Sequence, residues 1–257
     1  MRLVRPEQLL EQSFRKSAHS HGSLSTTSGT PSLEVFRAVE ALAEKEAGVA
    51  RTGRPRSFER DAALQTALRL FWEHGYEATS LAQLRTAMGI SSASFYAAFG
   101  SKEALFEEVV QNYMTSFGRV TGAVQREDLE PRAAVEEILR ASARMQTEAG
   151  HPTGCLMVLA GAVGSGDHEA VRALLADHRA AVRRDIATCV RRAIATGDLP
   201  PSTDAESMSS MFTGFLWGLS VESRDGTPLE NMDTAITYLM QAWDAARSAN
   251  AVTAGAD

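Results

Sequence analysis

From Ser57 onward, apolar residues recur at helical spacing, and no segment shows the strict alternation of a half-buried strand. The first such segment starts at Ser57, which can cap a helix, and closes at Gly75. Its apolar positions follow the i, i+3, i+4, i+7, i+8 pattern and are Leu64, Ala67, Leu68, Phe71 and Trp72. The pattern predicts an amphipathic helix.

Residues 79–102 (TSLAQLRTAMGISSASFYAAFGSK) predict two short helices joined by a tight turn, then the start of another helix. Gly89 is suited to end the first helix in the left-handed conformation. Ser91 can cap the second helix, with Ile90 and Phe95 as a hydrophobic staple. A short helix held by its aromatic side, with small side chains outward, suits the DNA major groove. An ordinary helical hairpin inside a bundle is the alternative.

The rest of the chain also reads as helical. Ser101 can cap a helix that runs to Phe117, and Pro131 opens the next. A glycine-interrupted segment follows, and then a long amphipathic helix. The last two helices begin at capping boxes and are rich in methionine and aromatic residues. The ranges and cap positions are His151–Gly166, Asp167–Thr196, Thr203 and Thr227. We therefore predict an all-α protein with two domains.

The expected domain limits follow the changes in composition. Residues 1–52 contain the Ser/Thr/Gly-rich stretch Ser17–Ser32 and predict a disordered or mis-started N-terminal extension. Residues 53–118 form the helix-turn-helix domain, and residues 119–247 form a second helical domain. Residues 248–257 are expected to be a flexible tail.

Composition narrows the class of protein. The net charge of −6 excludes a histone-like coat and requires any DNA site to be a local patch. Two cysteines give no disulfide framework and fit a reducing compartment. No apolar run approaches the roughly 20 residues that a membrane helix needs, and the first residues lack the apolar core of a secretion signal. We expect a cytoplasmic protein that does not contact the membrane.

Residues 53–115 resemble the N-terminal domain of the TetR/AcrR family of transcriptional regulators. The matching run begins GRPRSFERDAALQTALRLFWEHGYEATS, and its most specific part is FYAAFGSKEALF. The segment GFLWGLSVESRDG is similar to the start of the family's last helices. The resemblance implies a homodimer that places two reading heads on a palindromic double-stranded operator. It also implies a C-terminal domain for ligand binding and dimerisation, without a cofactor.

The resemblance carries DNA-contact roles to this chain. Phosphate contacts are expected from Thr79 or Ser80, from Tyr96 and from Lys102. The exposed side of the recognition helix is expected to face the bases, through Ser91, Ser92, Ala93, Ser94 and Ala97. Ala97 and Ala98 stand where many relatives have larger residues, so thymine-methyl contact and DNA shape should carry more of the specificity. Arg54 and Arg56 suit a minor-groove arm, with a solvated tail as the alternative.

In the second domain, we expect an apolar ligand cavity with a few polar groups. The candidate lining residues are Met145, Cys155, Leu156, Leu159, Leu175, His178, Arg179, Phe212 and Phe215. The last two helices are expected to form the core or the dimer interface, with Gly214 and Gly218 allowing close approach across a two-fold axis. The candidate interface residues are Met211, Gly214, Trp217, Gly218, Ile236, Met240 and Trp243.

The predicted function is a ligand-responsive transcriptional repressor that a small, largely apolar effector releases from its operator. A regulator switched by oxidation of Cys155 is one alternative, against the simpler interpretation of Cys155 as a small buried hydrophobe. A helical small-molecule-binding protein without DNA function is another. The histidines match no tetrahedral metal spacing, and no base is marked beside either cysteine, so we predict neither a metal site nor an enzyme.

Overall fold

The computed structural model describes residues 56–161 and 168–254 of the chain. The described residues belong to the compact unit Pro55–Asp257. The predicted extension over residues 1–52 and the expected contact from Arg54 lie outside the described residues. Arg56 is the first residue of helix α3.

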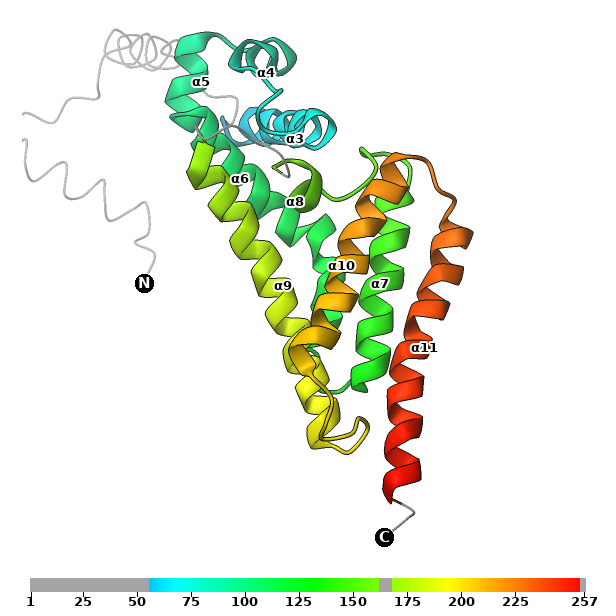
Figure 1. The fold of residues 1–257 in the computed structure, drawn as a ribbon. Coiled ribbons are helices and arrows are strands. Elements are labelled where there is room, and N and C mark those ends of the chain that lie inside the picture. Colours follow the sequence, from blue (N-terminus) through cyan, green and yellow to red (C-terminus); the bar gives the residue numbers. More distant parts are fainter. Residues whose placement is uncertain (1–55, 162–167, 255–257) are drawn as a thin grey trace, which may run out of the picture. The chain divides into compact units, whose positions relative to one another are not determined.

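Three helices form the helix-turn-helix unit (Figure 1), namely α3 (Arg56–His74), α4 (Leu81–Met88) and α5 (Ser92–Phe99). Helix α6 (Lys102–Thr115) follows and packs against α3 and α5. Gly89 ends α4 at φ +66°, in the left-handed region that favours glycine. The hydroxyl oxygens of Ser91 and Ser101 accept the amides of Ser94 and Ala104, so both predicted caps are confirmed.

The remaining helices pack as a bundle in which α7, α9, α10 and α11 run lengthwise (Figure 1). The chain enters this bundle through a 3₁₀ segment, and α7 contacts that segment, α9, α10 and α11. The bounds are η1 (Phe117–Gln125), α7 (Pro131–Thr147), α8 (Leu156–Leu159), α9 (Glu169–Ala195), α10 (Ala205–Arg224) and α11 (Leu229–Ala254).

Several predicted boundaries are corrected by the structure. Ser57 lies inside α3 instead of capping it. Asp204, not Thr203, caps α10, because its carboxylate accepts the amides of Glu206 and Ser207. The Thr227 hydroxyl donates to the Glu222 carboxylate at 2.6 Å instead of completing a capping box. Helix α11 continues to Ala254, so residues 248–254 are helical and not a flexible tail.

Two hydrophobic cores hold the described residues together. One core joins α3, α5 and α6 to α8 and to the start of α9, through Leu156, Val171 and Leu175. The other core joins α7, α9, α10 and α11. The helix-turn-helix unit therefore shares its core with elements from the second half of the chain. The described part of the chain contains no strand, which confirms the all-α prediction, and none of its helices is long and apolar enough to cross a membrane.

Candidate functional site

Helix α5 presents a surface of small side chains. Phe95 and Phe99 are buried and fix the aromatic side of the helix against the core. The opposite side is exposed at Ser91, Ala93, Ser94, Tyr96 and Ala97, while Ser92 is half-buried. The aromatic anchor therefore leaves hydroxyl and methyl groups, together with Tyr96, available to a partner. This arrangement fits a helix that enters a major groove.

The sequence left Thr79 and Ser80 as alternative phosphate contacts, and the structure at the start of α4 distinguishes them. Thr79 is fully buried, and its hydroxyl donates to the Gly75 carbonyl oxygen at 2.6 Å. Its side chain is therefore unavailable for the expected phosphate contact. Ser80 is exposed and caps α4 in a capping box with Gln83. The exposed helix start leaves Ser80 as the candidate phosphate contact.

Tyr96 and Lys102 lie in different environments. The side chain of Tyr96 is 52% exposed to solvent, although it is large and aromatic. The Lys102 ammonium lies 4.1 Å from the ring centre of the buried Tyr76. Burial lowers the pKa of Lys102, and the carboxylates of Glu77 and Glu103 oppose that shift. Burial, with help from Glu103, raises the pKa of Tyr76 to about 12, so this phenol stays neutral beneath the lysine.

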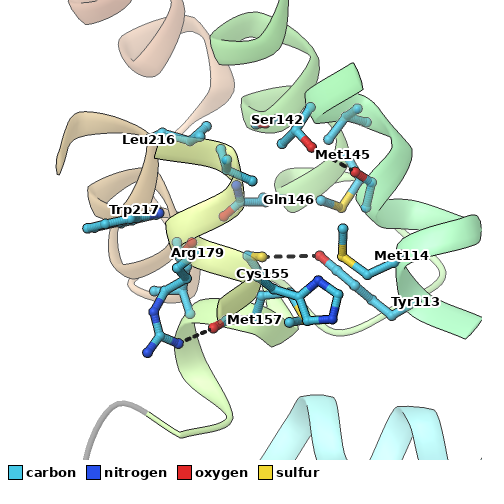
Figure 2. A pocket seen from close by; sticks show the side chains of 17 residues that line it. Tyr113, Met114, Ser142, Met145, Gln146, Cys155, Met157, Arg179, Leu216 and Trp217 are labelled. Atoms are coloured by element: carbon cyan, nitrogen blue, oxygen red, sulfur yellow. Dashed lines mark hydrogen bonds between the residues drawn. The ribbon is translucent and has the colours of Figure 1, made fainter. Parts of the chain in front are cut away.

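A small cavity of about 50 Å³ lies where α6, η1, α7, α8, α9 and α10 meet (Figure 2). Its wall is largely apolar, with sulfur atoms from three methionines. The lining residues are Tyr113, Met114, Gly118, Val120, Thr121, Ser142, Met145, Gln146, Cys155, Met157, Val158, His178, Arg179, Val182, Leu216, Trp217 and Ser220. Sites for drug-sized ligands typically measure about 300–1,000 Å³. The cavity must therefore widen before it can admit such a ligand.

Only part of the predicted lining reaches this cavity. Met145, Cys155, His178 and Arg179 line it. The other predicted residues do not. Leu156 and Leu175 are fully buried in the core of the helix-turn-helix unit, and Leu159 is absent from the lining. Phe212 and Phe215 belong to the core of the bundle. Helical periodicity identifies buried faces, but it does not tell which buried face borders a void.

The most informative polar groups in the wall were missed by the sequence analysis. The Gln146 Oε1 and Ser220 Oγ atoms are buried and have no hydrogen-bond partner among the described residues. Such a group costs about 1–3 kcal/mol when it is left unpaired. Both lie on buried stripes, Gln146 with Leu139 and Ser142 in α7 and Ser220 with Leu216 in α10. A polar residue on a buried stripe was the available signal.

Cys155 lies in the wall beside Tyr113, whose hydroxyl donates to the sulfur atom at 3.3 Å (Figure 2). Burial raises the pKa of the Cys155 thiol, and the hydrogen bond from Tyr113 only partly opposes this shift. The thiol is therefore protonated at neutral pH. Arg179 turns its guanidinium group toward the Met157 carbonyl oxygen, to which it donates at 2.7 Å.

The predicted dimer-interface residues divide into two groups. Met211, Gly214 and Gly218 are exposed along one side of α10, as an interface requires. The other predicted residues are corrected by the structure: Ile236, Met240 and Trp243 are buried in the core of their own subunit. Trp217 lines the cavity, with the Arg183 guanidinium 4.8 Å from the centre of its ring.

Hydrogen bonds connect two of the segments that carry cavity residues to the helix-turn-helix unit. The Trp72 indole donates to the Gly154 carbonyl oxygen at 3.0 Å, and the Tyr76 amide donates to the Ala160 carbonyl oxygen at 3.1 Å. Arg224, at the end of α10, donates to the carbonyl oxygens of Trp72 and Glu73, at 3.0 Å each. The end of α3 is therefore held by the segment around α8 and by the end of α10.

Comparisons with known proteins agree with this arrangement. Residues 63–109 match the family "Bacterial regulatory proteins, tetR family", and residues 118–243 match "Tetracyclin repressor-like, C-terminal domain". The chain is 32% identical over 192 residues to the HTH-type transcriptional repressor ComR of Escherichia coli, covering 74% of this chain and 91% of that protein. It is 30% identical over 180 residues to the repressor BdcR of the same organism, covering 70% and 86%.

A solved structure provides the same fold with DNA. A cysteine-substituted variant of the TetR family regulator CifR, in complex with a 26-base-pair operator, is 42% identical to this chain. It covers 74% of this chain and 100% of its own, with a TM-score of 0.69. The matched tetR-family region, residues 63–109, contains the helix-turn-helix helices α4 and α5. The chain belongs to the TetR family of transcriptional regulators and is a DNA-binding transcriptional repressor.

Proposed function

We propose that this repressor is a homodimer that a small, largely apolar effector releases from a palindromic operator. It would act in the cytoplasm, without catalysis and without a cofactor. Its two reading heads would enter successive major grooves about 34 Å apart. The observation that carries the proposal is the cavity, whose wall is hydrogen-bonded to the helix-turn-helix unit.

The DNA contacts that we propose come from groups at two helix starts and on α5. Ser80, Tyr96 and Lys102 would bind phosphate oxygens and fix the register. Helix α5 would face the bases through Ser91, Ser92, Ala93, Ser94 and Ala97. Because these side chains are small, hydroxyl contacts, thymine methyls and DNA shape would supply the specificity.

Effector release would follow from the size of the cavity. A ligand shifts an equilibrium only through its difference in affinity between two states. An effector too large for the present cavity binds only the conformation in which the cavity is widened. Widening displaces the segment that carries Cys155 and the end of α10, and both hold Trp72 through hydrogen bonds. The reading heads of the dimer would then lose the spacing that the operator requires.

The Cys155 switch is supported less well. A redox-sensing thiol is usually a thiolate with a lowered pKa. Burial instead raises the pKa of Cys155. A Cys155→Ser variant that is still released from DNA by the same compounds as the wild type would favour the reversible effector.

The first test measures binding to the DNA upstream of the protein's own gene across a salt titration. The double variant Tyr96→Ala/Lys102→Ala removes four proposed phosphate contacts from a dimer. Because only the charged lysines release counterions, the slope of log K against log salt should fall by roughly 2 in magnitude, at about 0.9 for each Lys102, while the loss of Tyr96 should lower the affinity at every salt concentration. An unchanged slope would contradict the assigned contacts. Screening compounds for release of this DNA then tests the effector, and a library without any active compound would count against it.

A further inference from the structure

The unpaired polar atoms of the cavity indicate what kind of molecule it accepts. Gln146 and Ser220 both line the cavity, and both residues are at most 2% exposed. Neither Gln146 Oε1 nor Ser220 Oγ has a hydrogen-bond partner among the described residues. Buried polar groups in folded proteins are nearly always paired, so two such atoms in one wall indicate a missing partner. A carbonyl oxygen accepts a hydrogen bond, and a hydroxyl group can accept or donate one.

Two other polar groups of the wall already have partners inside the protein. The Tyr113 hydroxyl donates to the Cys155 sulfur, and the Arg179 guanidinium donates to the Met157 carbonyl oxygen. The known lining contains no Asp or Glu that could pair with a cationic ligand. A carboxylate beside Gln146 Oε1 would meet a partial negative charge. The chemistry of the wall therefore favours a neutral ligand.

We infer that the effector is a compact, neutral alcohol or phenol, whose hydroxyl group donates to Gln146 Oε1 and bonds Ser220 Oγ while its apolar body contacts the methionines of the wall. This inference rests on the proposed function, because it assigns the chemistry of the molecule that binds the same cavity. It also explains why two buried side chains of α7 and α10 carry polar atoms without a partner among the described residues.

The test uses ligand pairs with and without the hydroxyl group, measured on the full chain without DNA. 4-Methylphenol and 1-naphthol should bind at least about tenfold more tightly than toluene and naphthalene, the gain expected for one well-formed hydrogen bond to a buried group. Titration calorimetry and the shift in Tm both report this difference. Equal affinities within a pair, no binding of either phenol, or tighter binding of 4-methylbenzoate would overturn the inference.

Substitutions separate a ligand-binding role from a structural one. Gln146→Met and Ser220→Ala remove the unpaired atoms, so the ligand-free Tm should stay unchanged or rise while the preference for phenols disappears. Ser209→Ala is the matched control, because this buried serine also lies on α10 but donates to the Arg183 carbonyl oxygen at 2.9 Å. It should lower the ligand-free Tm and keep the phenol preference. A preference that survives both cavity substitutions would overturn the inference.

The test of phenol binding can fail or succeed independently of the test of operator release. If other compounds release the operator but the phenol preference is absent, the effector mechanism stands and the assigned chemistry fails. If phenols bind as expected but neither they nor any library compound releases the operator, the cavity chemistry stands and the release mechanism fails.

Discussion

The Trp72 indole Nε1 lies 3.0 Å from the Gly154 carbonyl oxygen and donates a hydrogen bond to it in a buried site. Trp72 belongs to the first helix of the reading head, and Gly154 directly precedes the cavity residue Cys155. Edge-to-face contacts with Tyr113 and Phe117, and stacking on His151, hold the indole ring in place. One side chain therefore joins the DNA-binding unit to the cavity wall.

Replacing Trp72 by Phe keeps an aromatic ring but leaves the Gly154 carbonyl oxygen unpaired in a buried site. We expect the free energy of unfolding to fall by about 1–3 kcal/mol, in addition to the cost of the smaller ring. Denaturant unfolding would measure this loss. In DNA-release assays, the variant should need more effector, because the coupling contact is missing. An unchanged effector dose would show that the coupling runs through Arg224 or Tyr76 instead.

Thr79 and Ser80 form a matched pair of neighbouring hydroxyls with different roles. Thr79→Val removes a buried hydrogen bond and should cost about 1 kcal/mol of stability, while the affinity for DNA stays the same. Ser80→Ala should cost about as much stability through the lost cap and should also weaken DNA binding without changing its salt slope, because the lost hydroxyl contact is uncharged. Fluorescence anisotropy with labelled operator measures both affinities. A weakened affinity for Thr79→Val would contradict its burial as the reason for excluding it.

The thiol of Cys155 should react slowly at neutral pH. Burial raises its pKa, so the reactive thiolate appears only as the pH rises above the ordinary range of a free cysteine, near 8.5. Tyr113→Phe removes a hydrogen bond that stabilises the thiolate, so it should slow alkylation by iodoacetamide further. Mass spectrometry of the labelled peptides distinguishes Cys155 from Cys189. Labelling of Cys155 as fast as free cysteine at pH 7 would revive the thiol-switched alternative.

Gly154 is a position where a side chain has no room. Its φ is +80°, and a Cβ atom there would lie 2.9 Å from the Ser220 carbonyl oxygen and 2.5 Å from Leu159 Cδ1. Gly154→Ala should therefore cost about 2–4 kcal/mol, from the left-handed backbone and from displaced neighbours. Gly226→Ala is the matched control, since its φ is +86° with nothing within 4 Å of the added atom. It should cost only about 1–2 kcal/mol. Equal losses in thermal unfolding would contradict the steric argument.

The sequence predicted the features that depend on neighbouring residues. The caps at Ser91 and Ser101, the turn at Gly89 and the buried face of Phe95 and Phe99 follow from local spacing, and the structure confirms them. These features also carry the resemblance to the family. The first residue of a helix is harder to predict. Thr203 and Asp204 are both good cap residues, and only the path of the backbone selects Asp204.

The cavity depends on packing between distant segments, so it could be predicted only in part. Met145 and Cys155 were placed correctly, but Leu156 and Leu175 lie in the core of the reading head. Trp217 was assigned to the dimer interface because a stripe on a helix does not reveal which of its edges faces an internal void. That choice is made by how α7, α8, α9 and α10 meet.

The small volume of the cavity has a consequence for the speed of the response. A molecule too large for the cavity as it stands can bind only after the helices around the cavity separate through thermal fluctuations. At high effector concentration, the observed rate of binding should therefore stop rising and reach a plateau equal to the opening rate. The time in which the gene is switched on would then be set by the internal motion of the protein, and adding more effector would not shorten it.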